Sequence, residues 1–222
     1  MEMLAGQGVV ADIGCDHGRL SCALVQRGLA ERCIAIDISA PSLDKTRRLA
    51  AWVGVSDRVQ TRLGDGFTAL APYEADAVCL MGMGGTLMAR LFSACAIPFN
   101  GAGLAVLQPM RAAEDIRAWL YENRCWVLDD RVAEENGRLY QVFAASAPRS
   151  APQPLPDGWP EDCWFLGYTA FSNRAPLFAE LLEQQLALRE RRLMRGEAPC
   201  LRRQAEQLHK IKAAWEGRGL CN

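Results

Sequence analysis

The stretch Val9-Val10-Ala11-Asp12-Ile13-Gly14-Cys15-Asp16-His17-Gly18-Arg19-Leu20 decides how the rest of the chain is interpreted. Its apolar run ends at Ile13, Gly14 and Gly18 bracket a turn, and an amphipathic segment begins at Leu20. This pattern predicts a buried strand, a tight turn and the first turn of a helix. Such a unit offers a binding site at the helix N-terminus, because the first backbone N–H groups of a helix lack partners within it.

The spacing of the turn residues indicates what kind of ligand fits. A dinucleotide-binding turn reads G-x-G-x-x-G, and its middle glycine lets a pyrophosphate approach the backbone. Here the pattern is D-x-G-x-D-x-G, and Asp16 stands near that middle position, where its carboxylate would repel a pyrophosphate. S-adenosylmethionine instead carries a sulfonium and an ammonium, and carboxylates at Asp12 and Asp16 suit those cations. The alternative is an ordinary strand-to-helix turn with solvated acids.

Two further carboxylates follow predicted strands. Cys33–Ile38 is a short apolar run that contains Asp37, about 20 residues after the turn, where nucleotide-binding folds hold ribose hydroxyls. Val59–Gly66 predicts a third strand that ends in Gly-Asp-Gly, and Asp65 is a candidate acceptor for an adenine amino group. Each acid alone is more often a turn residue. Together they favour a ligand site, because α/β sheets bind ligands at the carboxyl ends of their strands.

A second glycine turn, Gly82-Met83-Gly84-Gly85, follows a predicted fourth strand at Ala75–Met81. It removes side chains at a place where a flat base could lie against the backbone, and Met83 could form an apolar wall there. A simple strand-to-helix turn, with Met83 in the core, explains the same residues equally well.

The remaining pattern predicts the fold class. A fifth strand at Leu104–Pro109 is followed by two strands, Trp126–Ala133 and Leu139–Ala145, and the Asn136-Gly137 dipeptide between them is a strong hairpin signal. Five strand–helix units closed by a hairpin predict an α/β protein. We expect a Rossmann-like, doubly wound, mostly parallel sheet with an antiparallel edge hairpin.

The C-terminal part has a different character. Residues 148–162 are rich in proline and predict an exposed, semi-extended linker between a domain at 1–147 and a region at 163–222. Two leucine-rich helical stripes, broken at Gly196 and Pro199, predict an α-helical hairpin in that last region. Its many basic residues are candidate contacts to nucleic-acid phosphates, although a solvated coiled-coil face has the same charge pattern.

Composition limits the class of protein. The net charge of −1 indicates no global attraction to nucleic acid, so such binding would need a local patch. The absence of a long apolar run or signal peptide predicts a cytoplasmic protein that does not enter a membrane. The nine cysteines form no C-x-x-C pair and only two histidines are present, so we expect reduced cysteines and no metal site.

With these pieces identified, the chain resembles the bacterial tRNA (adenine(22)-N1)-methyltransferases, which use S-adenosylmethionine and combine a Rossmann-like domain with a C-terminal coiled coil. The resemblance covers nearly the whole chain. The motifs that carry it are Ala11–Gly18, Arg62–Gly66, Gly82–Gly85, Leu107–Pro109 and Gly137–Tyr140. It departs from the family at Ser21, Met110 and Tyr168, where the family has Pro, Asn and Pro, and in lacking a helix before the first strand.

The resemblance implies roles for particular residues. The predicted cofactor-binding residues are Asp12, Gly14, Asp16, Gly18, Asp37, Ile38, Asp65, Gly66, Met81 and Gly82. The predicted substrate-binding residues are Met83, Gly84, Gly85, Gln108 and Pro109 near the target base, with Arg191, Arg192 and Arg195 on the helical hairpin gripping tRNA. The protein is expected to be a monomer or homodimer.

The implied reaction needs little acid–base chemistry, because N1 of adenine has an in-plane lone pair that can attack a methyl carbon directly. Positioning then dominates catalysis, and a carboxylate can stabilise the positive charge of the product base. Asp16 is the candidate for that role, with His17 beside it either orienting a group or serving as a structural residue. Two alternatives remain: a methyltransferase acting on a small molecule, a protein or another RNA, and a non-catalytic nucleic-acid-binding protein with a relic pocket.

Overall fold

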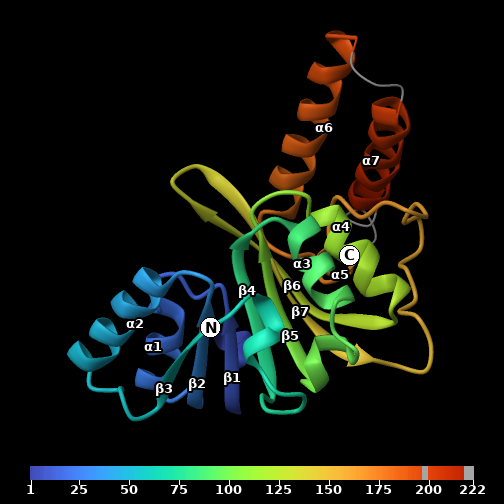
Figure 1. Cartoon of the computed structure of the whole chain (residues 1–222). Helices are drawn as coiled ribbons and strands as arrows, with labels where there is room; N and C mark the ends of the chain where they lie inside the picture. Colours follow the sequence, from blue (N-terminus) through green and yellow to red (C-terminus); the bar gives the residue numbers. More distant parts are fainter. Residues whose placement is uncertain (197–199, 218–222) are drawn as a thin grey trace.

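The computed structural model describes residues 1–196 and 200–217. Its strands form one seven-stranded sheet in the order β3-β2-β1-β4-β5-β7-β6 (Figure 1). They are β1 Gln7–Ile13, β2 Ala30–Asp37, β3 Val59–Leu63, β4 Ala77–Met83, β5 Leu104–Pro109, β6 Cys125–Glu135 and β7 Arg138–Pro148. Strands β1 to β5 pair in parallel, whereas β7 runs antiparallel to β5 and to β6. This confirms the predicted mostly parallel sheet with an antiparallel edge hairpin.

Helices cover both faces of the sheet. They are α1 Arg19–Gln26, α2 Ala40–Trp52, α3 Gly85–Ser93, α4 Ala113–Glu122 and α5 Tyr168–Ser172, with short 3-10 turns η1 Glu2–Leu4, η2 Gly66–Ala69 and η3 Pro98–Gly101. Val10 and Cys33 point into a core beneath α1 and α2, whereas Ala11 and Ile34 point into a core beneath α3, α4 and α5. Because side chains alternate along a strand, each buried strand contributes to both cores.

Several elements differ from the sequence-based expectation: β3 ends before the predicted Gly66, and β6 and β7 extend beyond the predicted strands at both ends. Strand β4 ends at Met83 instead of Met81, and its pairing with β5 shifts register between these two residues, where Gly82 has a φ of 75°. The bulge carries the strand through the first glycine of the predicted turn. Helix α5 was not predicted, because its five residues are too few to display a helical period.

The proline-rich segment is mostly exposed, but it is held against the domain at two points. Gln153 exchanges hydrogen bonds with the backbone of Val127 on β6, at 2.6 and 3.0 Å. The hydroxyl of Tyr168 donates to the same Gln153 side chain at 3.0 Å. Trp159 is only 7% exposed and packs against Phe171. The segment therefore lies against the sheet instead of spanning free space.

Helices α6 Phe178–Met194 and α7 Cys200–Gly217 lie side by side and rise away from the sheet (Figure 1). Leu186 and Leu208 are buried between them, an ion pair joins Glu183 to Lys212, and Nε2 of His209 lies 3.2 Å from the Glu190 carboxylate. These pairings require antiparallel helices, which confirms the predicted helical hairpin. The predicted break includes Gly196, which has a φ of 74°, and Pro199, which lies outside the described residues.

A buried ion pair joins α4 to the edge hairpin. Arg117 donates two hydrogen bonds to the carboxylate of Asp130 on β6, at 2.8 and 2.9 Å, and a third to Gln141 on β7 at 3.0 Å. Both charged side chains are at most 1% exposed. Gly167 packs so closely that a Cβ there would lie 1.8 Å from an Asp130 oxygen. This cluster fixes α4, the edge hairpin and the end of the proline-rich segment relative to one another.

Candidate functional site

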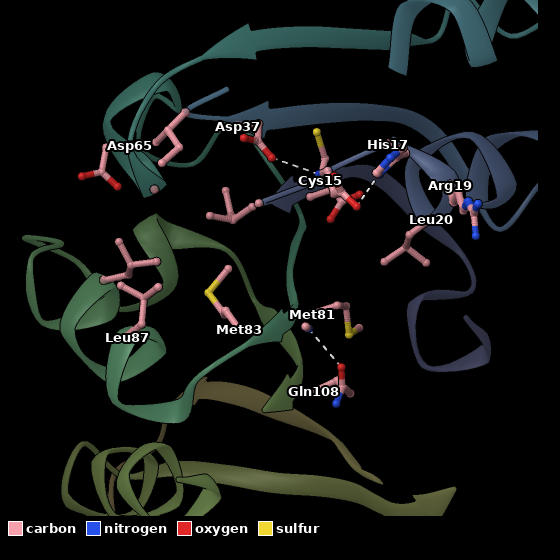
Figure 2. A pocket seen from close by; sticks show the side chains of 18 of the residues that line it. Cys15, His17, Arg19, Leu20, Asp37, Asp65, Met81, Met83, Leu87 and Gln108 are labelled. Atoms are coloured by element: carbon pink, nitrogen blue, oxygen red, sulfur yellow. Dashed lines mark hydrogen bonds and ion pairs between the residues drawn. The ribbon is translucent and has the colours of Figure 1, made fainter. Parts of the chain in front are cut away.

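A cavity of about 900 Å³ opens at the carboxyl ends of β1, β2, β3 and β4 (Figure 2). Its volume lies within the range of small-molecule sites, roughly 300–1,000 Å³. The predicted cofactor-binding residues in its wall are Asp12, Gly14, Asp16, Asp37, Ile38, Asp65, Gly66, Met81 and Gly82. The predicted residues His17, Met83 and Gln108 also line it. Residues separated by nearly a hundred positions thus meet because parallel strands end at one edge of the sheet.

The first glycine turn requires its two glycines for different reasons. Gly14 has a φ of 78°, and its N–H donates to the carbonyl of Ile36 on the neighbouring strand at 2.8 Å. A Cβ at this position would lie 2.9 Å from Cε of Met83 at the end of β4. Gly18 does not line the cavity; it has a φ of 67° and a Cβ there would lie 2.3 Å from Thr46 on α2. Gly14 therefore allows the Met83 side chain to approach the turn, whereas Gly18 allows close packing of helices.

A hydrogen-bonded chain of side chains lies along the rim of the turn. The carboxylate of Asp37 accepts from the backbone N–H of Asp16 at 3.0 Å and of Ser39 at 2.8 Å. Nδ1 of His17 contacts the Asp16 carboxylate, and Nε2 lies 3.3 Å from the ammonium of Lys45. His17 therefore lies between the Asp16 carboxylate and the Lys45 ammonium.

Asp12 is in a different environment from the other carboxylates. It is 3% exposed, and its two oxygens accept from the hydroxyl of Ser21 at 2.6 Å and the thiol of Cys79 at 3.6 Å. Burial raises the pKa of the Asp12 carboxyl. Ser21 stands where the related family has proline, so in this chain a hydroxyl holds Asp12 in the floor of the cavity. The carboxylate of Asp12 is thus directed at α1, and its cofactor role stays a prediction.

The two ends of the cavity differ in chemistry. Asp65 and Leu87 lie at one end, and Arg19 and Leu20 at the other (Figure 2). Gly66 has a φ of 57°, and a Cβ there would lie 2.5 Å from Leu91 on α3. The Asp65 end therefore combines a carboxylate with leucine side chains.

The glycines of the second turn lie in two different environments. Gly82 lines the cavity, has nothing within 4 Å of its Cβ position, and donates its N–H to Gln108 at 3.0 Å. Gly84 and Gly85 do not line the cavity, and a Cβ on Gly85 would lie 2.0 Å from the carbonyl oxygen of Ala112. Gly85 is thus explained by the packing of α3 against the loop before α4, and its substrate role stays a prediction.

Gln108 and Pro109, the predicted residues at the end of β5, line two different cavities. Gln108 lines the first cavity, whereas Pro109 lines a second cleft of about 640 Å³ beside it. The side-chain amide of Gln108 donates to the sulfur of Met110 at 3.4 Å. Met110, which stands where the related family has asparagine, therefore still contacts the glutamine that faces the cavity.

The predicted arginines of the helical hairpin lie apart from the first cavity. Arg192 lines the second cleft, and the guanidinium of Arg191 donates to the carbonyl of Ala187 on its own helix at 3.1 Å. Arg195 follows the last residue of α6 and is exposed. The structure therefore brings one of these three residues to a concave surface, and the tRNA role of all three stays a prediction.

Sequence reasoning missed several residues in the cavity wall. Glu135, at the end of β6, reaches the cavity although its strand lies at the far edge of the sheet. The hairpin itself was predictable from Asn-Gly, but the direction in which its tip points depends on the tertiary packing of the edge. Leu87 and Leu91 come from α3, whose apolar residues could equally have belonged to the core.

Residues 1–196 and 200–217 contain neither a cluster of metal-ligating side chains nor a membrane-spanning helix. No group of three or more His, Cys, Asp or Glu side chains there is arranged to hold a metal ion. None of the helices there is both long and apolar enough to cross a membrane.

Comparison with known proteins gives a consistent result for the sequence. Residues 1–143 match the family described as "Methyltransferase domain". Over 146 residues, or 66% of this chain, the sequence is 35% identical to the tRNA (adenine(22)-N(1))-methyltransferase of Bacillus subtilis, of which this stretch spans 61%. A putative tRNA methyltransferase of Mycoplasma pneumoniae is 29% identical over 65% of this chain and 66% of that protein.

Solved structures match the fold over almost its full length. A putative tRNA (m1A22) methyltransferase of Streptococcus pneumoniae covers 96% of this chain and 94% of its own, with 22% identity and a TM-score of 0.78. The M1A22 tRNA methyltransferase TrmK of B. subtilis covers 95% of this chain and 93% of its own, with 24% identity and a TM-score of 0.72. These likenesses establish the Rossmann-like fold together with its C-terminal helical pair.

Proposed function

This chain belongs to the methyltransferase-domain family, and from that premise we propose that it transfers a methyl group from S-adenosylmethionine to N1 of an adenine in tRNA. The observation that carries the proposal is the acidic cavity at the strand ends. Its wall has carboxylates at Asp12, Asp16, Asp37, Asp65 and Glu135, against Arg19 and a histidine. A cavity of that charge favours a cationic ligand and disfavours a pyrophosphate.

The residues of the cavity fit the different parts of this cofactor. Both carboxylate oxygens of Asp37 accept hydrogen bonds from backbone N–H groups, yet each oxygen keeps a second lone pair for a ribose hydroxyl. Asp65, with Leu87 and Leu91 near it, suits the adenine ring and its amino group. Gly14 and Asp16 lie in the cavity wall where the methionine part would bind. When bound, S-adenosylmethionine supplies an electrophilic methyl group on a sulfonium.

The protein's own contribution to the reaction is positioning and charge. Adenine N1 attacks without a base, so the side chains have to hold the ring in line and exclude water. The Asp16 carboxylate lies at the rim, and a carboxylate there stabilises the positive charge that develops on the base. His17, which lies between Lys45 and the Asp16 carboxylate, orients that carboxylate. Asp16 is therefore assigned as the catalytic residue and His17 as a positioning residue.

The choice of tRNA as substrate rests on the relatives. The B. subtilis protein, 35% identical over the aligned stretch, is named for this reaction, and the M. pneumoniae protein is named as a putative tRNA methyltransferase. The base must be unpaired or extruded, because its N1 edge is occupied in a duplex. We assign residues 1–147 to the cofactor and residues 163–222 to tRNA contact, and a cytoplasmic location follows from that substrate.

The test begins with S-adenosylmethionine binding by calorimetry, followed by reaction with unmodified tRNA transcript and mapping of any methylated base. We expect binding, and N1-methyladenine in the tRNA. Binding without methylated RNA would move the search to another substrate, and no binding would remove the methyltransferase assignment for this chain.

Asp16→Ala tests the catalytic assignment within the same assay. Its side chain is 69% exposed, so the fold and melting temperature should be unchanged. Turnover should fall by roughly 10²–10³-fold, as for loss of one preorganised charge-stabilising group. Asp44→Ala, which removes a 62% exposed carboxylate on α2 outside the cavity, is the matched control and should keep wild-type turnover. Wild-type activity in Asp16→Ala would exclude Asp16 from the mechanism.

A further inference from the structure

The second cleft, of about 640 Å³, lies between the sheet and the helical hairpin. Its walls come from the loop between β5 and α4, from the start of β7, and from the facing sides of α6 and α7. It begins where the first cavity ends. Gln108 lines the cavity and Pro109 the cleft, and across the hairpin turn Glu135 lines the cavity and Arg138 the cleft.

The charge of the cleft is opposite to that of the cavity. Its lining cations are Arg111, Arg138, Arg189 and Arg192, and its lining carboxylate is Glu114. Guanidinium groups bind phosphate oxygens with paired hydrogen bonds, and neighbouring cations raise the local concentration of an anionic chain. The cleft therefore favours an anion, next to a cavity that favours a cation.

Arg189 shows that the positive charge is built into the cleft. It is 6% exposed, and its guanidinium stacks 3.9 Å from the ring of Phe165. Its guanidinium donates to neutral acceptors, the side chains of Gln204 at 3.1 Å and Gln185 at 2.7 Å. Burial lowers the pKa of this guanidinium, while the charge of the Glu114 carboxylate in the same cleft acts in the opposite direction. Its direct acceptors are amide oxygens and a backbone carbonyl, so its charge adds to the positive lining of the cleft.

The cleft also has surfaces for a base. Tyr140 and Leu139 on β7 are half-buried, and Leu188 on α6 is 42% exposed. Aromatic and apolar side chains beside cationic ones are what a single-stranded nucleotide requires, since its base stacks while its phosphate is neutralised. The N-terminus of the ten-residue helix α4, at Ala113, lies in the same wall and adds its partial positive charge.

We propose that this cleft binds a nucleotide of the RNA substrate other than the one that is methylated. The inference rests on the proposed function, because an adenine extruded into the first cavity must draw its flanking backbone across the boundary at Gln108 and Pro109. Arg111 and Arg138 contact the phosphate, and Tyr140 contacts the base. The acidic cavity excludes the phosphates, so the strand is directed into the basic cleft.

The double variant Arg111→Ala/Arg138→Ala tests this proposal by titration of the full-length protein with unmodified tRNA transcript at several salt concentrations. Both side chains are exposed, so the fold should be retained. We expect the Kd for RNA to rise about 10–100-fold and the slope of log Kd against log salt to fall by about 2, as for two lost phosphate contacts. The affinity for S-adenosylmethionine should be unchanged.

Arg48→Ala, on the exposed side of α2, is the matched control and should leave RNA binding within about twofold of wild type. An unchanged Kd in the double variant, or an equal loss in the control, would overturn the cleft proposal. Tyr140→Ala should weaken the binding of a single-stranded oligonucleotide without changing the slope of log Kd against log salt. If the wild type binds RNA but does not methylate it, the proposed function fails while the cleft is still decided by these titrations. A wild-type protein that bound no RNA would also overturn the cleft proposal.

Discussion

The acidic cavity and the basic cleft lie side by side at one end of the sheet, yet they are assembled in different ways. The cavity is formed mainly by turns that directly follow strands, such as those at Gly14 and Asp37. The cleft is formed by segments far apart in sequence, from Pro109 to Gln204, which meet only when the helical hairpin packs against the sheet. The cavity is therefore a local property of strand ends, whereas the cleft depends on the arrangement of the whole molecule.

The largest effect on this arrangement is expected from Arg117→Met. Arg117 joins α4 to Asp130 on β6 and to Gln141, which itself lines the cleft. Removing one partner leaves a buried carboxylate without its cation, which typically costs about 3–5 kcal/mol. The free energy of unfolding, measured by urea titration, should fall by that amount.

The double variant Arg117→Met/Asp130→Leu controls for the ion pair itself. Replacing both charges with apolar groups should recover most of the lost stability, because no buried charge remains unpaired. At temperatures where the single variant Arg117→Met is still folded, this single variant should bind S-adenosylmethionine normally and RNA weakly. Equal stability of Arg117→Met and wild type would contradict the role given to this cluster.

A smaller and more local effect is expected from Asp37→Ala. The substitution removes the acceptor for the backbone N–H groups of Asp16 and Ser39, and the proposed ribose contact. Loss of hydrogen bonds to a charged group typically costs about 1.5–3 kcal/mol, so the Kd for S-adenosylmethionine should rise roughly 10–100-fold. Calorimetry measures this directly, and the Kd for RNA should not change.

Asp37→Asn refines the experiment, because the amide keeps one acceptor oxygen and should give an intermediate loss. Asp44→Ala, an exposed carboxylate on the helix that follows, should behave as wild type. If Asp37→Ala weakened the binding of RNA and of S-adenosylmethionine equally, the proposal that the cavity and the cleft bind different ligands would be wrong.

The same contrast explains how much of the molecule could be predicted from its sequence. The apolar run that ends at Pro109 defines β5 to the residue, and β3 begins at the predicted Val59 but ends at Leu63, because strand period and breakers are local signals. The strand ends then place Asp37 and Asp65 at one edge, since consecutive parallel strands share their direction. The cavity residues near these turns were therefore accessible to sequence reasoning.

Other features could not be predicted from local sequence signals. Glu135 lines the cavity although β6 is the edge strand, and Arg189 lines the cleft together with residues of β7 and α7 that are distant in sequence. The tight packing of Gly85 against Ala112 depends on a loop almost 30 residues away. Ser21 illustrates a further limit: it appeared as a departure from the family, and only its 2.6 Å hydrogen bond shows what it does for Asp12.

The smallest expected effect concerns the loop that carries Asp65. Glu74 accepts two hydrogen bonds from Arg62, at 2.7 and 2.5 Å, and a third from the backbone N–H of Ala71 at 3.0 Å. These bonds close the segment between β3 and β4 that forms one wall of the acidic cavity. Glu74→Gln should lower the free energy of unfolding at pH 7 by about 1 kcal/mol, as for a partly exposed charged pair.

The pH dependence identifies that contribution. The Arg62 guanidinium, with the Ala71 N–H, lowers the pKa of Glu74 from 4.5 to about 2. The folded protein therefore binds fewer protons than the unfolded chain in this window, so the stabilisation is complete above pH 4.5 and is lost as the pH falls through about 2. The stability difference between wild type and Glu74→Gln should accordingly shrink on acid titration. Asp57→Asn, which removes a 78% exposed carboxylate 3.8 Å from Arg58, should show no such change. A difference that persisted at pH 2 would mean that Glu74 acts through packing and not through its charge.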